Sequence, residues 1–397
     1  METHAVNTDV PALARLQQWA LIVGFWGLVA GAVGGFLNPD QFFRSWLIAV
    51  LFCLGLSLGS LALLMLQHMS GGQWGLVGRR VFEAASRTLP LVALAFVPLL
   101  FGLPNLYKWA RPELVPTDHI LQVKAPYLNV PFFVGRAVFY FAVWMLCAWL
   151  LNKWSSGQDR GEVAVRPGDT LRFRQVSAPG LLVYVLTMTF ASVDWIMSLD
   201  PTWYSTIFGL IIVAGQGLSA LSLVIIVLSL LSGTEPYAKY LRPGHFLDLG
   251  KLLLAFVMLW AYFAFSQFLI IWAGNLPEEI PFFVNRLSHG WQYVSLAVLL
   301  GHFALPFVLL LSRDLKKRPG LLAKVAALVL VMRLVDLLWL VEPMFEPTGF
   351  PIHWLDVALP MGLIGLWIFL FARTLRSRAL LPLNDPFFKE AFAHDVH

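Results

Sequence analysis

The chain contains ten apolar stretches that are each long enough to cross a lipid bilayer, and this feature limits its fold more than any other. A helix needs about 20 apolar residues to span the hydrocarbon core. Only helices or closed barrels satisfy every backbone polar group there, and runs of this length predict helices. We therefore expect an all-α polytopic membrane protein with about ten transmembrane helices. The stretches cover residues 16–36, 44–67, 84–103, 132–152, 178–197, 206–231, 250–274, 287–312, 320–344 and 354–375.

The composition agrees with this fold class. Hydrophobic residues make up 58% of the chain and charged residues 13%, whereas an average soluble domain is roughly 25% charged. The ten spans account for nearly all of residues 1–397, so we expect a single integral membrane domain. Spans two to five (44–197) and six to nine (206–344) begin with the same orientation, which is compatible with a parallel duplication of four-helix units.

The basic residues predict the orientation in the membrane. Most of the 28 Lys and Arg residues fall in segments on the same side as the N-terminus. Cytoplasmic loops carry an excess of Lys and Arg, so both termini are expected to be cytoplasmic. The formal net charge of +5 is thereby explained by topology, and no nucleic-acid partner is expected.

Two opposite charges stand in the middle of the ninth span. Arg333 and Asp336 are three residues apart within the apolar run 321–341, so on a helix they share a face and can pair. A charge at the bilayer centre costs roughly 2.5–3.5 kcal/mol and usually marks an ion or proton route. The alternative interpretation is an ion pair that serves helix packing. The sequence leaves both open.

Other titratable residues extend from this pair toward both membrane surfaces, as a proton path requires. The topology places Asp194, His289, Glu342 and Asp356 on the outer side, and Glu83 toward the cytoplasm. Glu83 and Arg87 are expected to pair, either at a proton inlet or as an ordinary interfacial pair. The candidate path residues are Asp194, His289, His302, Arg333, Asp336, Glu342, Asp356 and Glu83.

The motifs for bound cofactors are missing from the sequence. Cys53 and Cys147 lie inside spans, without a CxxC or CxxCH motif that would indicate an iron-sulfur cluster or attached haem c. His302 and His289 are on one span and so do not form a facing pair for haem b. We expect no cofactor bound by this chain, no metal site and no catalysis by the chain alone.

Three further segments carry expectations. Span 16–36 is rich in glycine, which permits close helix packing, although a lipid-facing anchor is the alternative. Residues 104–131 form a long outer loop that we interpret as a docking surface, and residues 152–175 a solvated connection. The eighth span opens with polar residues three apart, which are Arg286, His289 and Gln292.

Four segments together resemble one membrane-protein family. They are ASVDWIMSLDPTWYSTIFG (191–209), LIIWAGNLPEEIPFFVNR (269–286), GHFALPFVLLLSRDLKK (301–317) and RLVDLLWLVEP (333–343). They resemble the ActF-type subunit of bacterial alternative complex III, also described as quinol:cytochrome c oxidoreductase quinone-binding subunit 2, in the NrfD/polysulfide-reductase membrane family. The resemblance implies two four-helix bundles, 44–197 and 206–344, flanked by spans 16–36 and 354–375.

The resemblance also implies a setting. The complex would be a quinol:cytochrome c (or other periplasmic acceptor) oxidoreductase of the bacterial inner membrane, serving respiratory or photosynthetic electron transfer. Its partners would be a sister NrfD-like subunit, an iron-sulfur protein, c-type cytochromes that carry the haem c, and lipid. The sister subunit would oxidise quinol, while this chain would supply a scaffold and a proton path. A quinone is a candidate ligand for which the sequence identifies no residue set.

Two other functions compete with this one. A standalone secondary transporter commonly shows inverted repeats and broken helices at mid-depth, and the sequence shows neither. A purely structural subunit would use the buried charges for packing alone. Purification in mild detergent separates the first alternative from a complex subunit, because only a subunit comes out with haem-bearing partners.

Overall fold

The computed structural model describes residues 10–160, 170–346, 349, 352–382 and 384–388, and every regular element within them is helical. Nine helical spans in this part of the chain are long and apolar enough to cross a membrane. A tenth helix, α16 (Pro319–Val341), has spanning length but includes Lys324, Arg333 and Asp336. The predicted all-α polytopic membrane fold is therefore confirmed.

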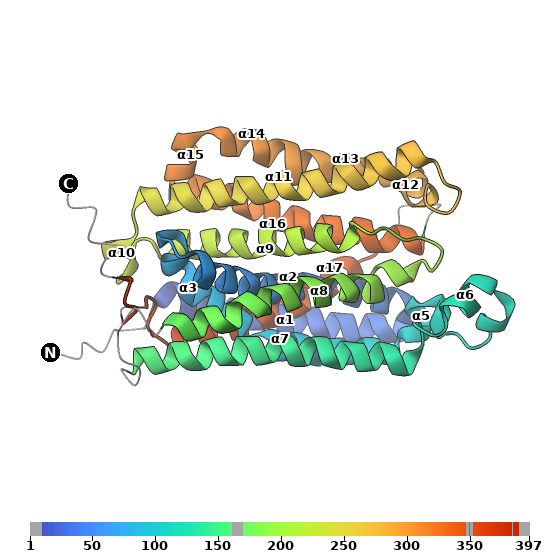
Figure 1. Ribbon diagram of the computed structural model, residues 1–397, viewed down its shortest axis with the longest axis horizontal. Coiled ribbons are helices and arrows are strands. Elements are labelled where there is room, and N and C mark those ends of the chain that lie inside the picture. Colours follow the sequence, from blue (N-terminus) through green and yellow to red (C-terminus); the bar gives the residue numbers. More distant parts are fainter. Residues whose placement is uncertain (1–9, 161–169, 347–348, 350–351, 383, 389–397) are drawn as a thin grey trace.

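The observed helices follow the predicted spans closely. The nine are α1 (Pro11–Leu37), α2 (Pro39–Ser70), α3 with α4 (Gln73–Ser86 and Leu89–Phe101), α7 (Val130–Asp159), α8 (Leu171–Trp195), α9 (Phe208–Leu231), α11 (Pro243–Gly274), α13 to α14 (Trp291–Leu311) and α17 (Leu355–Arg376). They lie side by side along the long axis of the molecule (Figure 1). We call the end with α3, α10 (Tyr237–Tyr240) and α15 (Arg313–Lys317) the basic end, and the opposite end, with α12 (Pro281–Arg286), the loop end.

Helices α2 and α9 form the centre of the bundle. Almost the whole of α2 is buried between Ser45 and Leu61, and α9 is buried along most of its length. Helix α2 packs on α3, α4 and α8, whereas α9 packs on α11 and α16, and the two central helices also pack on each other. This arrangement is compatible with the two predicted four-helix groups. The division into groups stays a prediction, because α2 and α9 join them closely.

Helices α1 and α17 flank the bundle and pack on each other through glycine. A Cβ atom built on Gly27 would lie 2.6 Å from the Cα of Gly362, and one on Gly365 would lie 2.6 Å from the Cα of Gly24. The two backbones are therefore in direct contact, as small-residue motifs allow in membranes. For the glycine-rich first span, the structure shows close helix packing and not only a lipid-facing anchor.

Replacing Gly27 with leucine is expected to separate α1 from α17. The larger side chain has no space against the Gly362 backbone, and overpacking costs about 1–3 kcal/mol. Unfolding in mixed micelles should show this loss. Gly135→Leu is the matched control, since Gly135 lies on the exposed face of α7 with nothing within 4 Å. Equal stability of the two variants would contradict the packing interpretation.

The connections differ from the sequence expectations in two places. The first part of the polar segment 152–175 is helix and not a solvated connection, because α7 continues to Asp159 and buries Asn152 and Ser155. Residues 161–169 of this segment lie outside the described residues. The third span begins earlier than expected, after a tight turn in which Gly71 and Gly72 have φ angles of 71° and 98°. Positive φ favours glycine at both positions.

The segment 104–131, expected to be an outer loop, folds into short helices at the loop end (Figure 1). They are α5 (Leu103–Leu106), η1 (Lys108–Ala110), η2 (Val115–Thr117) and α6 (His119–Lys124). Tyr107 anchors them, because its hydroxyl donates a hydrogen bond of 2.9 Å to the carbonyl of Trp195 in the last turn of α8. The segment is thus ordered against the bundle, and its role in docking a partner stays a prediction.

Candidate functional site

The charge pair of α16 lies in the middle of the molecule. Arg333 and Asp336 are both buried, and Nη1 of Arg333 donates to the Asp336 carboxylate, so the predicted ion pair forms. Their spacing of three residues places both on the helix face that packs against α9. A Cβ atom on Gly215 of α9 would lie 2.4 Å from Cζ of Arg333. The guanidinium of Arg333 therefore packs directly against the backbone of Gly215, which has no side chain.

Two polar side chains of neighbouring helices join this pair. The Tyr184 hydroxyl of α8 donates a 2.8 Å hydrogen bond to Oε1 of Gln216, the residue after Gly215. The same stretch of α9 touches α2, because a Cβ atom on Gly59 would lie 2.2 Å from the carbonyl oxygen of Gln216. The sequence signal was a glutamine inside the apolar run 206–231. Tyr184 gave no signal, since tyrosine is common in spans.

His302 lies in an element that packs against α16. It is fully buried in a π-helical segment, η5 (Leu299–Ala304), and its ring meets that of Trp260 edge-on at 4.5 Å. Within the described residues neither ring nitrogen has a partner of good hydrogen-bond geometry. π segments often occur at functional sites. We call Arg333, Asp336, Gln216, Tyr184 and His302 the central cluster.

Two buried carboxyl groups meet at the loop end. Gln41, in the first turns of α2, donates hydrogen bonds of 2.8 Å to Asp356 and 3.3 Å to Glu342. Ser45, one turn further, donates a bond of 2.5 Å to the same Asp356 oxygen. The backbone N–H of His353 donates to the other oxygen at 3.0 Å. One amide thus bridges two carboxyl groups in this Asp356 cluster.

Arg286 fixes the end of α16 beside this cluster. Its guanidinium donates to the carbonyls of Trp339, Leu340 and Phe282 at 2.8–3.0 Å, so it caps the free carbonyls that end a helix. The polar repeat predicted for the eighth span is wrong, because Arg286 ends α12 whereas α13 begins at Trp291. His289 lies exposed in the turn between them, with φ 53°.

Asp194 is buried in α8 beside another arginine. Arg136 of α7 binds it through Nε and Nη2 at 2.8 and 2.9 Å, and the Tyr140 hydroxyl donates a third bond of 2.9 Å. These three charged or hydroxyl donors satisfy both oxygens of the buried carboxylate. The structure therefore places Asp194 in a closed ion pair of its own, and not with the central cluster.

A third cluster of charges lies at the basic end. Glu83 of α3 binds Nε of Arg79 at 3.0 Å and Nη1 of Arg80 at 2.7 Å, and the Ser155 hydroxyl donates to it at 2.7 Å. The predicted pair of Glu83 with Arg87 is wrong, because Arg87 follows the last turn of α3 and is exposed. Asp159 pairs with Arg80 and Asp385 with Arg79. This is the Glu83 cluster.

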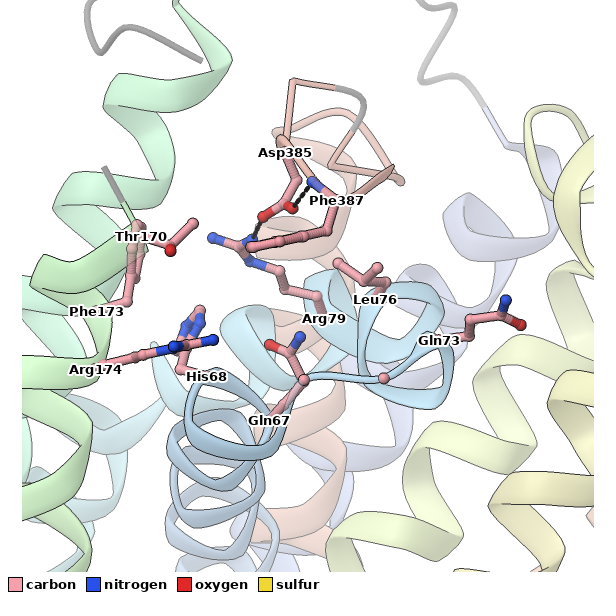
Figure 2. A pocket seen from close by; sticks show the side chains of 12 residues that line it. Gln67, His68, Gln73, Leu76, Arg79, Thr170, Phe173, Arg174, Asp385 and Phe387 are labelled. Carbon is pink, nitrogen blue, oxygen red and sulfur yellow. Dashed lines mark hydrogen bonds and ion pairs between the residues drawn. The ribbon is translucent and has the colours of Figure 1, made fainter. Parts of the chain in front are cut away.

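A pocket of about 390 Å³ opens beside the Glu83 cluster. Figure 2 shows Gln67 and His68 at the end of α2, facing Arg79 and Asp385 across it. The His68 ring lies 4.6 Å from that of Phe173. Oε1 of Gln67 and Nε2 of His68 are buried without a hydrogen-bond partner among the described residues, so the pocket wall offers polar atoms to water or a ligand.

Helix α2 passes the Asp356 cluster, the central cluster and the pocket, so positions along it give their separations along the helix axis. Ser45 belongs to the loop end, Gly59 touches the central cluster and Gln67 borders the pocket. At 1.5 Å per residue, the eight residues from Gly59 to Gln67 span about 12 Å, and the six from Asp336 to Glu342 on α16 span about 9 Å. The clusters are therefore neighbours in depth without direct hydrogen bonds between them.

Two hydroxyl groups lie in the interval between the central cluster and the pocket. Ser60 of α2 and Ser222 of α9 are buried, and the Oγ atom of each has no partner among the described residues. Buried polar atoms of this kind are where ordered water is expected. With Gln67 and His68 at the pocket, unpartnered polar atoms therefore occur at several positions along α2 and α9 between the pocket and Arg333.

The described residues contain no group of three His, Cys, Asp or Glu side chains that could hold a metal ion. A search of models of known protein families finds no match to this chain. A search of curated proteins also finds no match.

Proposed function

We propose that the chain is a membrane subunit of a quinol:cytochrome c (or other periplasmic acceptor) oxidoreductase, in which it supplies a scaffold and a proton path. It carries no redox cofactor of its own and lies in the bacterial inner membrane with both termini cytoplasmic. The resemblance of four segments to the NrfD-like ActF subunit supports the setting. The partners are then a sister NrfD-like subunit, an iron-sulfur protein and c-type cytochromes.

The observation that carries the proton path is the series of unpartnered polar atoms. Proton transfer needs groups within hydrogen-bond or water-bridged reach. Gln67 and His68 line the pocket, and Ser60 and Ser222 lie between it and the central cluster along α2 and α9, where water would have to complete the path. A proton would enter at the pocket, pass by water to Asp336 and Arg333, and leave through the Asp356 cluster. Asp194 and His289 lie off this route.

A purely structural role is the second candidate, and one observation favours it. Among the described clusters, the charged groups outside the Asp356 cluster are paired: Arg333 with Asp336, Arg136 with Asp194, and Glu83 with its two arginines. Fully paired buried charges can serve packing specificity alone. A measurement of proton movement is needed to separate the two roles.

Asp336→Asn is expected to lower the number of protons moved per electron while quinol oxidation continues. The amide keeps the size of the side chain and can still accept from Arg333, but it no longer exchanges a proton. The measurement is the proton-to-electron ratio of the whole complex in proteoliposomes. Asp248→Asn is the control, since Asp248 is exposed and pairs only with exposed Lys251. Unchanged ratios for Asp336→Asn and for Ser60→Leu would reject the proton path and leave the scaffold.

Membership of a complex is tested separately. Purification from native membranes in mild detergent should bring haem-bearing partners with the chain, visible as a c-type absorbance spectrum. Recovery of the chain alone or as a homo-oligomer would contradict the proposed setting and favour a standalone transporter.

A further inference from the structure

A second cavity at the basic end is distinct from the pocket of Figure 2. It has a volume of about 410 Å³ and lies between α4, α7 and the segment that follows α17. Four of its lining residues are cations: Arg87, Lys153, Arg160 and Arg378. None of its lining residues is a carboxylate, so the lining gives the cavity a positive electrostatic potential that favours an anion.

The lining changes from apolar to cationic in one direction. Along α7, Met145, Trp149 and Lys153 follow each other at intervals of four residues, and therefore share one helix face. Across the cavity, Leu89 begins α4 and Arg87 lies just before it, nearer to the basic end. Both walls therefore place apolar groups deeper in the membrane and cations nearer its surface.

The side chains of Trp149, Lys153 and Asn152 have properties expected at the depth of lipid head groups. Trp149 is 56% exposed, and Nζ of Lys153 lies 4.7 Å from the centre of its ring. Tryptophan and lysine in this arrangement are typical of the membrane interface. Oδ1 of Asn152, in the cavity wall, is buried without a partner among the described residues, so it can accept a hydrogen bond from a head-group hydroxyl.

The cations also affect one another. Burial lowers the pKa of Arg378 below its ordinary value, and the charge of Arg87 lowers it further. The carboxylates of Glu83 and Asp159 act in the opposite direction and raise this pKa. Nη1 of Arg378 is buried without a hydrogen-bond partner among the described residues. An anion between Arg87 and Arg378 would relieve their repulsion and supply the missing acceptor.

We propose that this cavity binds an anionic phospholipid, whose phosphate is held by Arg87, Lys153 and Arg378 and whose acyl chains lie along Met145, Trp149 and Leu89. Basic pockets between transmembrane helices have this chemistry. The phosphate alone would leave the apolar half of the cavity uncovered, and a neutral lipid would leave the cations unpaired. The inference does not depend on the proposed proton path.

The test is native mass spectrometry of the purified full chain, titrated with phosphatidylglycerol or with phosphatidylcholine of the same acyl chains. Each interfacial cation contributes roughly fivefold to binding, so the triple variant Arg87→Gln, Lys153→Gln, Arg378→Gln should bind phosphatidylglycerol roughly 100-fold more weakly. The single variant Lys153→Gln changes an exposed residue and should lose roughly fivefold, so the proposal stays testable if the triple variant does not fold.

The matched control is Arg313→Gln, Lys317→Gln, Arg318→Gln, which removes three cations at the same end of the molecule but outside the cavity. It should bind phosphatidylglycerol like the unmodified chain. Equal binding of phosphatidylcholine, or equal losses in the control triple variant, would overturn the proposal. Displacement of the lipid by inorganic phosphate would identify a site for the free ion instead, and would also overturn it.

Discussion

Replacing Arg333 with methionine is expected to lower the free energy of unfolding by about 3–5 kcal/mol, because it leaves the Asp336 carboxylate buried without the charged partner that it has among the described residues. Asp336→Leu should cost a similar amount, since the guanidinium then lies unpaired against Gly215. The double variant Arg333→Met, Asp336→Leu removes both charges. It should recover most of the lost stability, because apolar residues of similar volume often replace a buried pair without loss. Reversible unfolding in mixed micelles measures all three.

The control pair is Lys251 and Asp248, which is also spaced three residues apart but exposed. Its disruption should cost at most about 1 kcal/mol. If the Arg333 and Asp336 variants were additive, with the double variant the least stable, the two side chains would not act as a pair.

Sequence reasoning succeeded where the interaction is local in the chain. Nine of the ten expected spans appear among the described residues as helices long and apolar enough to cross a membrane, and hydropathy predicts them because each must satisfy its backbone internally. The pairing of Arg333 with Asp336 follows from helix geometry, because a spacing of three residues leaves the two on one face whatever the rest of the fold does. Their burial follows from the cost of exposing charge to lipid.

Sequence reasoning failed where helix rotation decides the partner. Glu83 has arginines on both sides in sequence, and spacing alone favoured Arg87. In the structure α3 turns Arg79, Arg80 and Glu83 inward, where Ser155 of α7 meets them. Beyond this helix Arg79 pairs with Asp385, 306 positions away, and donates to Gln158, and no local pattern indicates such contacts.

The Asp356 cluster shows the same limit in another form. Glu342 and Asp356 were expected on one side of the membrane, which their clustering at the loop end agrees with. The bridging role of Gln41 cannot be predicted from the sequence, because a glutamine near the start of a span is typical of an interfacial residue. Bridging residues of this kind are found only when the packing of α2 between α16 and α17 is known.

Glu83→Ala is expected to lower the free energy of unfolding by about 3–5 kcal/mol, because two buried arginines lose the carboxylate that they share. Arg87→Gln should change it by less than about 0.5 kcal/mol in lipid-free detergent, as for other exposed positions. A double-mutant cycle separates the two pairings: Glu83 with Arg80→Gln should show coupling of at least about 1 kcal/mol, and Glu83 with Arg87→Gln almost none. Strong coupling to Arg87 would restore the pairing that spacing alone predicts and would contradict the inward rotation of α3.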